Sequence, residues 1–354
     1  MNMLKTIIKG SMIMGALVMS FPTLAGNEDR IGSAGASEML VNPWARSTGF
    51  GSAGVASTNG LEAQFSNIAG LAFTDKTQIK FNYTNWLGDA NIALNSAGIA
   101  QRVGEQTVIA LSLQAFGYGA IDITTVDLPE GGIGQFTPRK NIINVGVARE
   151  FSNSIYAGLN VKMLNENIAN LKATGVAFDA GVRYVTGEQD HIKFGITLKN
   201  VGTPMKFQGD GLSQEIFYQS TGSSATLIQR SSSFELPSLL ALGFAYDFIF
   251  NENSKLTAAA AFHANSFTND QFNFGVDYGI AFDKAAINIR AGYVGEKAIF
   301  DRELSTTSIT GLTAGISVDA LLGDKKIPLG FEYAMRMSNP FGVISTFGVT
   351  LSLK

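Results

Sequence analysis

Apolar and polar side chains alternate with a period of two along much of this chain. From Phe272 to Phe282, apolar residues hold the even positions, and asparagine, aspartate, glycine or alanine hold the odd ones. The segments Ile192–Lys199 and Ile287–Tyr293 alternate in the same way, as does most of the stretch 341–353. Because successive side chains of an extended strand point to opposite faces, these segments are predicted to be β-strands with one apolar face.

Fourteen segments of roughly ten residues or more follow this pattern, and an even number is typical of bacterial outer-membrane β-barrels. A soluble β-sandwich would also alternate, so the pattern alone does not decide between the two classes. We predict strands near residues 77–86, 92–101, 105–117, 141–151, 154–164, 173–185, 191–200, 234–249, 254–265, 270–282, 285–295, 308–320, 326–337 and 341–353.

The connections between these strands favour the membrane barrel. Every even-numbered connection is short, whereas the odd-numbered set contains all the long ones, Tyr118–Lys140, Val201–Ser233 and Glu296–Thr307. Outer-membrane barrels have short turns at the periplasmic end and long loops at the external end, so long and short connections alternate along the chain. A β-sandwich is not expected to show this alternation. The sequence therefore predicts an all-β fold, a transmembrane antiparallel β-barrel of about 14 strands over residues 77–354, located in the outer membrane as a multi-pass protein.

The composition agrees with strands that face lipid. Charged residues make up 16% of the chain, below the roughly 25% usual for soluble domains. A lysine or arginine on the lipid face costs about 2–4 kcal/mol at the bilayer midplane. The charges inside strands mostly share the polar face, and mutual compensation in a wet lumen is a simpler interpretation of them than a specific site. These charged residues are Lys162, Asp179, Arg183, Lys193, Asp277, Arg290, Asp319, Glu332 and Arg336, and candidates for aromatic girdles are Tyr83, Trp86, Tyr184, Tyr278, Tyr293 and Tyr333.

The first 25 residues read as a signal peptide. Lys5 and Lys9 precede a short apolar stretch, Ser11–Met19, and Thr23-Leu-Ala25 resembles a cleavage site. A membrane anchor is the alternative, but this stretch is shorter than the roughly 20 residues that a spanning helix needs. We therefore expect residues 1–25 to be removed on export.

Residues 26–76 do not alternate and precede the first strand. Ser33–Val41 could form a short helix that ends at Asn42-Pro43, and Leu61–Ala72 could form another, with a glycine-rich stretch between them. A fourteen-stranded cylinder leaves a lumen unless something fills it. We predict that this segment is a plug, with candidate plug residues Trp44, Arg46, Gln64, Asn67 and Gly70.

Motifs for chemistry are weak. Gly49–Gly54 matches G-x-G-x-x-G with Asp75 about twenty residues on, but a dinucleotide site needs that loop between a strand and a helix. The two histidines, His191 and His263, lack an acidic cluster at ligand spacing, and the chain has no cysteine. With 29 acidic and 26 basic residues it has no basic run for nucleic acid. We expect no cofactor, no metal and no enzymatic activity, although four acidic loop residues could bind a cation: Asp122, Asp127, Glu130 and Asp210.

A family resemblance begins at the plug. Gly32–Leu40, Ala45–Ala56 and Gln64–Ala72 resemble in order the N-terminal signature of the PorV/PorQ family, with Asn67-Ile-Ala-Gly-Leu71 at its Asn-Pro-Ala-Gly-Leu block. Later segments resemble it too: Asn200–Pro204, Leu236–Tyr246 and Gly311–Ile316. This family comprises outer-membrane barrels of the type IX secretion system of Bacteroidetes, related in fold to the fatty-acid transporter FadL.

The resemblance implies a non-enzymatic secretion component that binds the translocon or the attachment machinery and the C-terminal domains of secreted cargo. PorV-like and PorQ-like roles both remain open. FadL-like uptake of a hydrophobic small molecule through the lumen is the alternative, and a purely structural barrel is a third class. Because apolar side chains on an external loop suggest a protein partner, we expect partner contacts in the second long loop, at Met205, Phe207, Ile216, Phe217, Tyr218 and Leu227.

Overall fold

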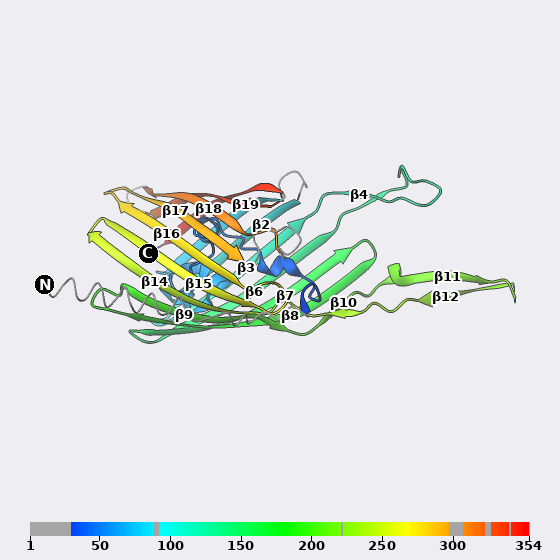
Figure 1. The fold of residues 1–354 in the computed structure, drawn as a ribbon, viewed down its shortest axis with the longest axis horizontal. Helices are drawn as coiled ribbons and strands as arrows, with labels where there is room; N and C mark the ends of the chain where they lie inside the picture. Colours follow the sequence, from blue (N-terminus) through cyan, green and yellow to red (C-terminus); the bar gives the residue numbers. More distant parts are fainter. Residues whose placement is uncertain are drawn as a thin grey trace.

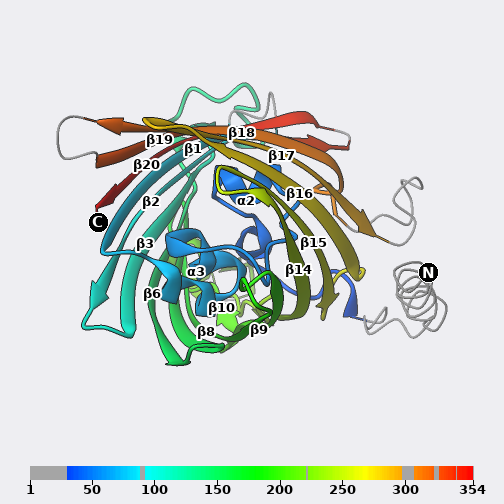
Figure 2. The same cartoon turned by 90° about the vertical axis from the view of Figure 1, so that its left-hand side faces the viewer.

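The protein is a closed β-barrel with a plug inside it (Figures 1 and 2). The computed structural model describes residues 30–87, 92–220, 222–296, 307–322, 327–339 and 341–353. The expected signal peptide, residues 1–25, lies outside the described residues. Fourteen antiparallel strands form the wall, and β1 pairs with β20, from Thr77↔Leu353 to Asn85↔Ser345, to close the ring. The predicted all-β barrel of 14 strands is therefore confirmed.

Each predicted strand corresponds to one strand of the wall. In chain order the wall strands are β1 (Thr77–Trp86), β2 (Ile92–Val103), β3 (Thr107–Gly117), β6 (Arg139–Ser152), β7 (Ile155–Ile168), β8 (Leu171–Thr186), β9 (Ile192–Gly202), β14 (Leu239–Asn251), β15 (Ser254–Asn265), β16 (Gln271–Ala281), β17 (Ala285–Glu296), β18 (Gly311–Leu322), β19 (Ile327–Ser338) and β20 (Gly342–Leu353).

The main boundary error is at the start of β14. The sequence suggested residue 234, but β14 begins at Leu239. The chain before it pairs elsewhere, because β13 (Ser233–Phe234) forms a two-stranded sheet with β10 (Met205–Lys206). Apolar residues in this stretch therefore belong to the base of a loop, and the alternation of the wall starts after Pro237.

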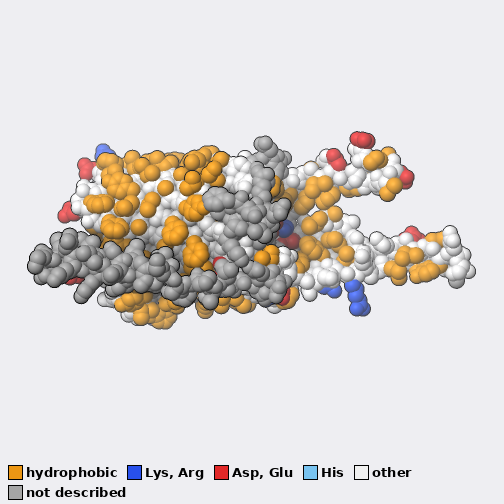
Figure 3. Space-filling view, viewed as in Figure 1, with side chains coloured by type: hydrophobic (Ala, Val, Ile, Leu, Met, Phe, Trp, Pro, Cys, Tyr) orange, Lys and Arg blue, Asp and Glu red, His pale blue; other side chains and the backbone are white. Residues whose placement is uncertain are grey.

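Side chains alternate between lipid and lumen as predicted. In β1, Ile79 and Phe81 are exposed outward, whereas Lys80 and Asn82 are buried inward. The same outward apolar pattern covers much of the barrel wall (Figure 3). Trp86 is a correction: it occupies a lumen-facing position of β1 and is buried, so it is not part of an interfacial girdle.

Long and short connections separate to opposite ends of the barrel. The turns 104–106, 153–154 and 252–253 lie at one end, whereas the connections 118–138 and 203–238 emerge at the other. Each long connection projects well beyond the wall (Figure 1). The first carries β4 (Ile121–Asp122) and β5 (Gln135–Phe136), and the second carries β11 (Ser213–Tyr218) and β12 (Ser223–Ile228).

The part of the chain from Ser37 to Phe73, which holds the plug turns, lies inside the ring (Figure 2). Its first turns are η2 (Ser37–Leu40) and α2 (Ala45–Gly49). The predicted second helix is three short pieces, which are η3 (Gly60–Glu62), α3 (Ala63–Ser66) and η4 (Ile68–Phe73).

Asn67 interrupts this second helix because its backbone is extended, with φ −151°, and its side chain accepts a hydrogen bond from the Ala69 backbone N–H. Local side-chain hydrogen bonding of this kind competes with continuous helix. Among the described residues, none of the helices has both the length and the apolar character needed to cross a membrane.

Candidate functional site

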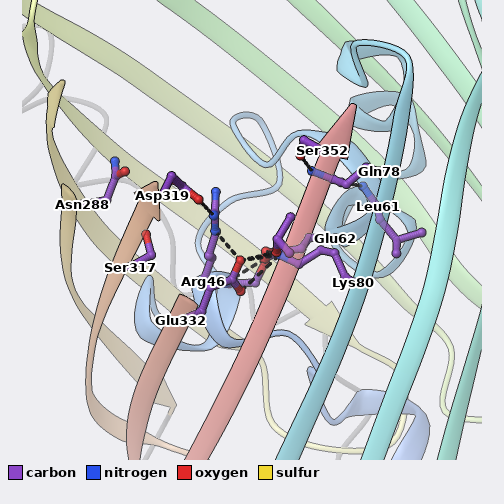
Figure 4. Close-up of polar contacts among 12 residues, drawn as sticks. Arg46, Leu61, Glu62, Gln78, Lys80, Asn288, Ser317, Asp319, Glu332 and Ser352 are labelled. Atoms are coloured by element: carbon purple, nitrogen blue, oxygen red, sulfur yellow. Dashed lines mark hydrogen bonds and ion pairs between the residues drawn. The ribbon is translucent and has the colours of Figure 1, made fainter. Parts of the chain in front are cut away.

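Five charged side chains join the plug to the wall (Figure 4). Arg46 of α2 donates through Nε to Glu332 of β19 at 2.7 Å and through Nη2 to Asp319 of β18 at 2.6 Å. Lys80 of β1 lies 3.0 Å from the same Glu332 carboxylate and also pairs with Glu62 of η3. Arg46, Glu62, Lys80, Asp319 and Glu332, which we call the ion cluster, thus tie two plug turns to three wall strands.

The ion cluster is nearly free of solvent at its centre. The side chains of Lys80 and Glu332 are each 1% exposed. Burial alone would lower the pKa of Arg46, but Glu332 and Asp319 raise that pKa above its ordinary value, so the guanidinium stays charged. If the plug moved, the buried charges of the wall would lose their partners, and a buried charge without a partner is strongly destabilising. The ion cluster therefore favours one position of the plug.

Neutral polar contacts hold the rest of the plug. Gln64 donates to Asn160 of β7 at 3.0 Å and accepts from Ser112 of β3 at 2.8 Å. Asn67 donates to the carbonyl of Val182 in β8 at 3.1 Å. These bonds satisfy amides that would otherwise be buried without partners, which would cost about 1–3 kcal/mol each.

Glycines let the plug backbone pack closely, against the wall at Gly49 and against the plug itself at Gly70. A Cβ on Gly49 would lie 2.8 Å from the Cα of Gly315 in β18, and one on Gly70 would lie 2.1 Å from the carbonyl oxygen of Thr58. Trp44 fills the space beside α2, fully buried, with Lys80 Nζ 5.9 Å from its ring centre. All five candidate plug residues therefore lie in the packed interior of the barrel or its contact with the wall.

Glu62 and Lys80 were missed among the candidate plug residues. The alternation of β1 places Lys80 on the lumen face between Ile79 and Phe81, which is a usable signal. Its acidic partners lie 18 and 252 residues away in the chain, at Glu62 and Glu332, so no local spacing reveals them.

The first residues of the plug also contact the bases of both long connections. Glu38 accepts from Tyr118 Oη at 2.9 Å and from Lys140 Nζ at 2.6 Å, on either side of the first connection. Gly35 N–H donates to the carbonyl of Glu235 at 3.0 Å, at the base of the second. Residues 30–41, which we call the latch, thus bridge the two loops that project from the barrel.

The electrostatics of the latch centre on Glu38. Burial would raise the pKa of Glu38, but the charge and hydrogen bond of Lys140 outweigh it and lower that pKa below its ordinary value. Burial and the Glu38 carboxylate together raise the pKa of Tyr118. The contact is therefore a carboxylate held by one ammonium and one hydroxyl donor.

The predicted partner-binding residues divide into two groups. Met205 is fully buried against Gly175 at the loop base, and Phe207 contacts Phe234 with 5.8 Å between ring centres and the ring planes tilted by 38°. The burial of Met205 corrects its assignment as a contact residue, because it has no surface to offer. The other four are exposed on the β11–β12 hairpin: Ile216, Phe217, Tyr218 and Leu227.

The β11–β12 hairpin, which we call the arm, has no core of its own. Every residue of both strands is exposed. On one face lie Ile216, Tyr218 and Leu227, and on the other lie Phe217 and Ile228. Figure 3 shows apolar side chains grouped on this projection, separate from those of the barrel wall.

The weak chemical motifs gain no support. Gly49–Gly54 runs from α2 into a turn packed against the wall, so it does not connect a strand to a helix. Within the part of the chain that the structure describes, no three histidine or acidic residues cluster as a metal site would require.

A closed fourteen-stranded barrel with an apolar outer surface and an N-terminal plug is an outer-membrane β-barrel. The family model described as type IX secretion system protein PorV matches residues 25–268. The chain therefore belongs to the PorV family and is an outer-membrane component of type IX secretion. No curated protein matches the chain.

Solved structures with the same fold are FadL-like. A FadL homologue of Pseudomonas aeruginosa is 12% identical, with 87% of this chain and 96% of that chain covered and a TM-score of 0.53. The toluene transporter TodX of Pseudomonas putida is 11% identical, with 88% and 98% covered and a TM-score of 0.53. The monoaromatic hydrocarbon channel CymD is 11% identical, with 89% of this chain and 98% of that chain covered and a TM-score of 0.52. At these identities the likeness shows the fold alone.

Proposed function

We propose that this barrel is a non-enzymatic binding component of the type IX system, and that its arm docks another protein. The partners would be translocon or attachment proteins and the C-terminal domains of secreted cargo. The observation that carries the proposal is the arm itself, a hairpin with apolar side chains on both faces and no residue buried.

The physics of an isolated hairpin supports a partner. Two strands without a packed face are marginally stable in water. Burying one large apolar side chain contributes about 1.5–3 kcal/mol, and Phe217, at 63% exposed, leaves most of that gain unused. The outer edges of β11 and β12 have no further strand paired to them among the described residues. A partner could therefore bind by adding a strand or by covering one face.

The arm can be removed cleanly. The Gln229 N–H donates to the Leu212 carbonyl at 2.8 Å, so the two ends already lie at turn distance. Replacing Ser213–Ile228 with two glycines should leave the barrel intact. The full-length and shortened proteins are then used to pull down partners from native outer membranes in mild detergent, with identification by mass spectrometry.

We expect secretion proteins to co-purify with the full protein and not with the shortened one. A matched control removes 124–133 from the other projection, where the Ile123 N–H meets the Gly134 carbonyl at 2.8 Å. Unchanged partners after loss of the arm would refute the arm as the docking site. Absence of any secretion protein with the full chain would refute the function.

FadL-like uptake of a hydrophobic small molecule is the second candidate. A lumenal cavity of about 350 Å³ between the plug and the wall favours it, because ligand pockets commonly begin near this size. Release of a lipid-like ligand from the protein purified out of native membranes, detected by mass spectrometry, would favour uptake over docking.

A further inference from the structure

The arm has two strand edges, one along β11 and one along β12. The two strands form a sheet by themselves, and among the described residues no third strand pairs with either one. The fourteen wall strands, in contrast, form a closed ring, and closure removes the edges of a sheet. The arm therefore exposes backbone groups along its strands that the wall does not.

The hydrogen-bond pattern of the arm shows which backbone groups face outward. The Gln229 N–H donates to the Leu212 carbonyl at 2.8 Å, and these two residues lie opposite each other, one step before the first pair of the ladder. Opposite residues of an antiparallel pair alternate between bonded and non-bonded pairs. Glu215 and Thr226, three steps further along, are therefore a non-bonded pair. Their N–H and C=O groups point away from the hairpin, one set on each edge.

The two edges differ in charge. β12 reads Ser-Ser-Ala-Thr-Leu-Ile, with no charged residue, no proline and no glycine, whereas β11 carries Glu215 near its centre. Free edges are usually guarded by charged side chains or proline, which discourage pairing with other chains. The β12 edge has neither, so of the two it is better suited to accept a strand.

The distribution of apolar side chains favours an edge over a face. Ile216, Tyr218 and Leu227 lie on one face of the arm, and Phe217 and Ile228 lie on the other. A partner that covered one face would leave the apolar side chains of the other face in water. An added strand places its own side chains on both faces, because successive residues of a strand alternate.

We propose that the β12 edge binds a partner protein by strand addition, with an uncharged extended segment of the partner as the third strand of the arm. The proposal rests on the arm being the docking site and specifies the contact. The added backbone would bond to the outward N–H and C=O groups of Ser224, Thr226 and Ile228, and such main-chain bonds supply the affinity in strand addition. Apolar side chains of the partner would lie beside Leu227 and Ile228, and small or polar ones beside Ser224.

The test places proline on one edge at a time. Thr226 and Glu215 lie opposite each other, so Thr226→Pro and Glu215→Pro each remove one outward donor, from β12 and β11 respectively. Both variants are used to pull down secretion proteins from native outer membranes in mild detergent, with quantification by mass spectrometry. We expect Thr226→Pro to lower capture by about tenfold or more and Glu215→Pro to leave it unchanged. Equal capture by the two variants would overturn strand addition at β12.

Alanine variants separate the backbone from the side chain. Thr226→Ala and Glu215→Ala keep both outward N–H groups, and each should capture as much partner as the unmodified protein does. A loss with Thr226→Ala as large as with Thr226→Pro would assign the contact to the side chain and refute strand addition. If Thr226→Pro disturbs the arm itself, seen as faster protease cleavage than in Glu215→Pro, Ser224→Pro repeats the test at the next outward N–H.

The mode of binding and the docking site can fail separately. Loss of capture on deletion of Ser213–Ile228, together with full capture by Thr226→Pro, would refute the edge and leave the arm as the docking site. Full capture after the deletion would refute docking through the arm itself. A second copy of the chain is the other possible occupant, so light scattering of the purified protein should give a mass that Thr226→Pro does not change. A dimer that Thr226→Pro dissociates would assign the edge to self-association and overturn the proposal.

Discussion

Arg46 in the plug and Glu332 in the wall, 286 residues apart in the chain, form an ion pair of 2.7 Å inside the barrel. The pair connects the plug, which precedes the first wall strand in the sequence, to one of the later wall strands. The plug enters the ring that β20 closes, and its arginine is held by strands β18 and β19 near the end of the sequence. The plug position is thus set in part by wall residues that lie 273 and 286 positions after Arg46 in the sequence.

Arg46→Gln should loosen the plug. It leaves Lys80 alone with three carboxylates, Glu62, Asp319 and Glu332, and we expect a loss of roughly 3–5 kcal/mol in plug docking. The measurement is the frequency of open-channel events in planar bilayers, which should rise. Arg30→Gln is the matched control, because Arg30 pairs with Glu235 at the exposed rim and such pairs contribute about 0–1 kcal/mol. Equal behaviour of the two variants would show that the ion cluster does not hold the plug.

Removing residues 31–72 should open the lumen. This range holds the plug turns from η2 to η4 except Phe73, the last residue of η4, and the glycine contacts leave little room beside α2. We expect single-channel conductance in planar bilayers to be severalfold higher than for the full protein. Heat-shifted mobility on gels serves as the control for a closed barrel, and an unchanged conductance in a folded sample would mean that something else blocks the lumen.

Close packing at α2 gives a second test of the plug. Gly49→Ala places a methyl group 2.8 Å from the Gly315 backbone, and overpacking of this kind costs about 1–3 kcal/mol. We expect faster protease cleavage within the plug. Gly117→Ala is the control, since a Cβ there meets nothing within 4 Å. If both variants resist protease equally, the contact between α2 and β18 is looser than the structure shows.

Acid should release the latch. The pKa of Glu38 is lowered below its ordinary value of 4.5 in the folded protein, so the carboxylate contributes stability that is full above about pH 4.5. That stability is lost as the pH falls through the lower pKa of the folded state. Lys140, Tyr118 and Glu166 are the titratable groups around it.

A spin label reports this release. The chain has no cysteine, so Ser33→Cys gives one labelling position, exposed at the start of the latch. We expect label mobility to increase as the pH falls below about 4.5, and Glu38→Gln to make the label mobile already at pH 7. A pH response that persists in Glu38→Gln would assign the effect to another carboxylate, such as Glu166.

The wall could be predicted from the sequence because its signal is local. Alternation at positions such as Ile79, Lys80 and Phe81 shows which face of a strand meets lipid. The loop lengths distinguish the end of the barrel with short turns from the end with long loops. The ion cluster could not be predicted, because Lys80 and Glu332 meet only after the ring closes. Met205 was misassigned for a related reason. Its loop looked external, but a glycine in β8, Gly175, makes the space that buries it.

This difference between Met205 and Phe217 separates stability from binding. Met205→Ala should leave a void at the loop base and lower the free energy of unfolding by about 2–5 kcal/mol, and it should leave partner capture unchanged in the samples that fold. Phe217→Ser should change stability by less than about 0.5 kcal/mol, as surface substitutions usually do, and it should reduce partner capture at least tenfold. Urea unfolding in lipid vesicles measures the first effect, and quantitative pull-down from native outer membranes measures the second. These expectations follow from burial, because Phe217 is 63% exposed and Met205 is 0% exposed. If instead Phe217→Ser lowered stability and Met205→Ala reduced partner capture, the arm would be folded against the barrel in the membrane and the loop base would be the docking surface.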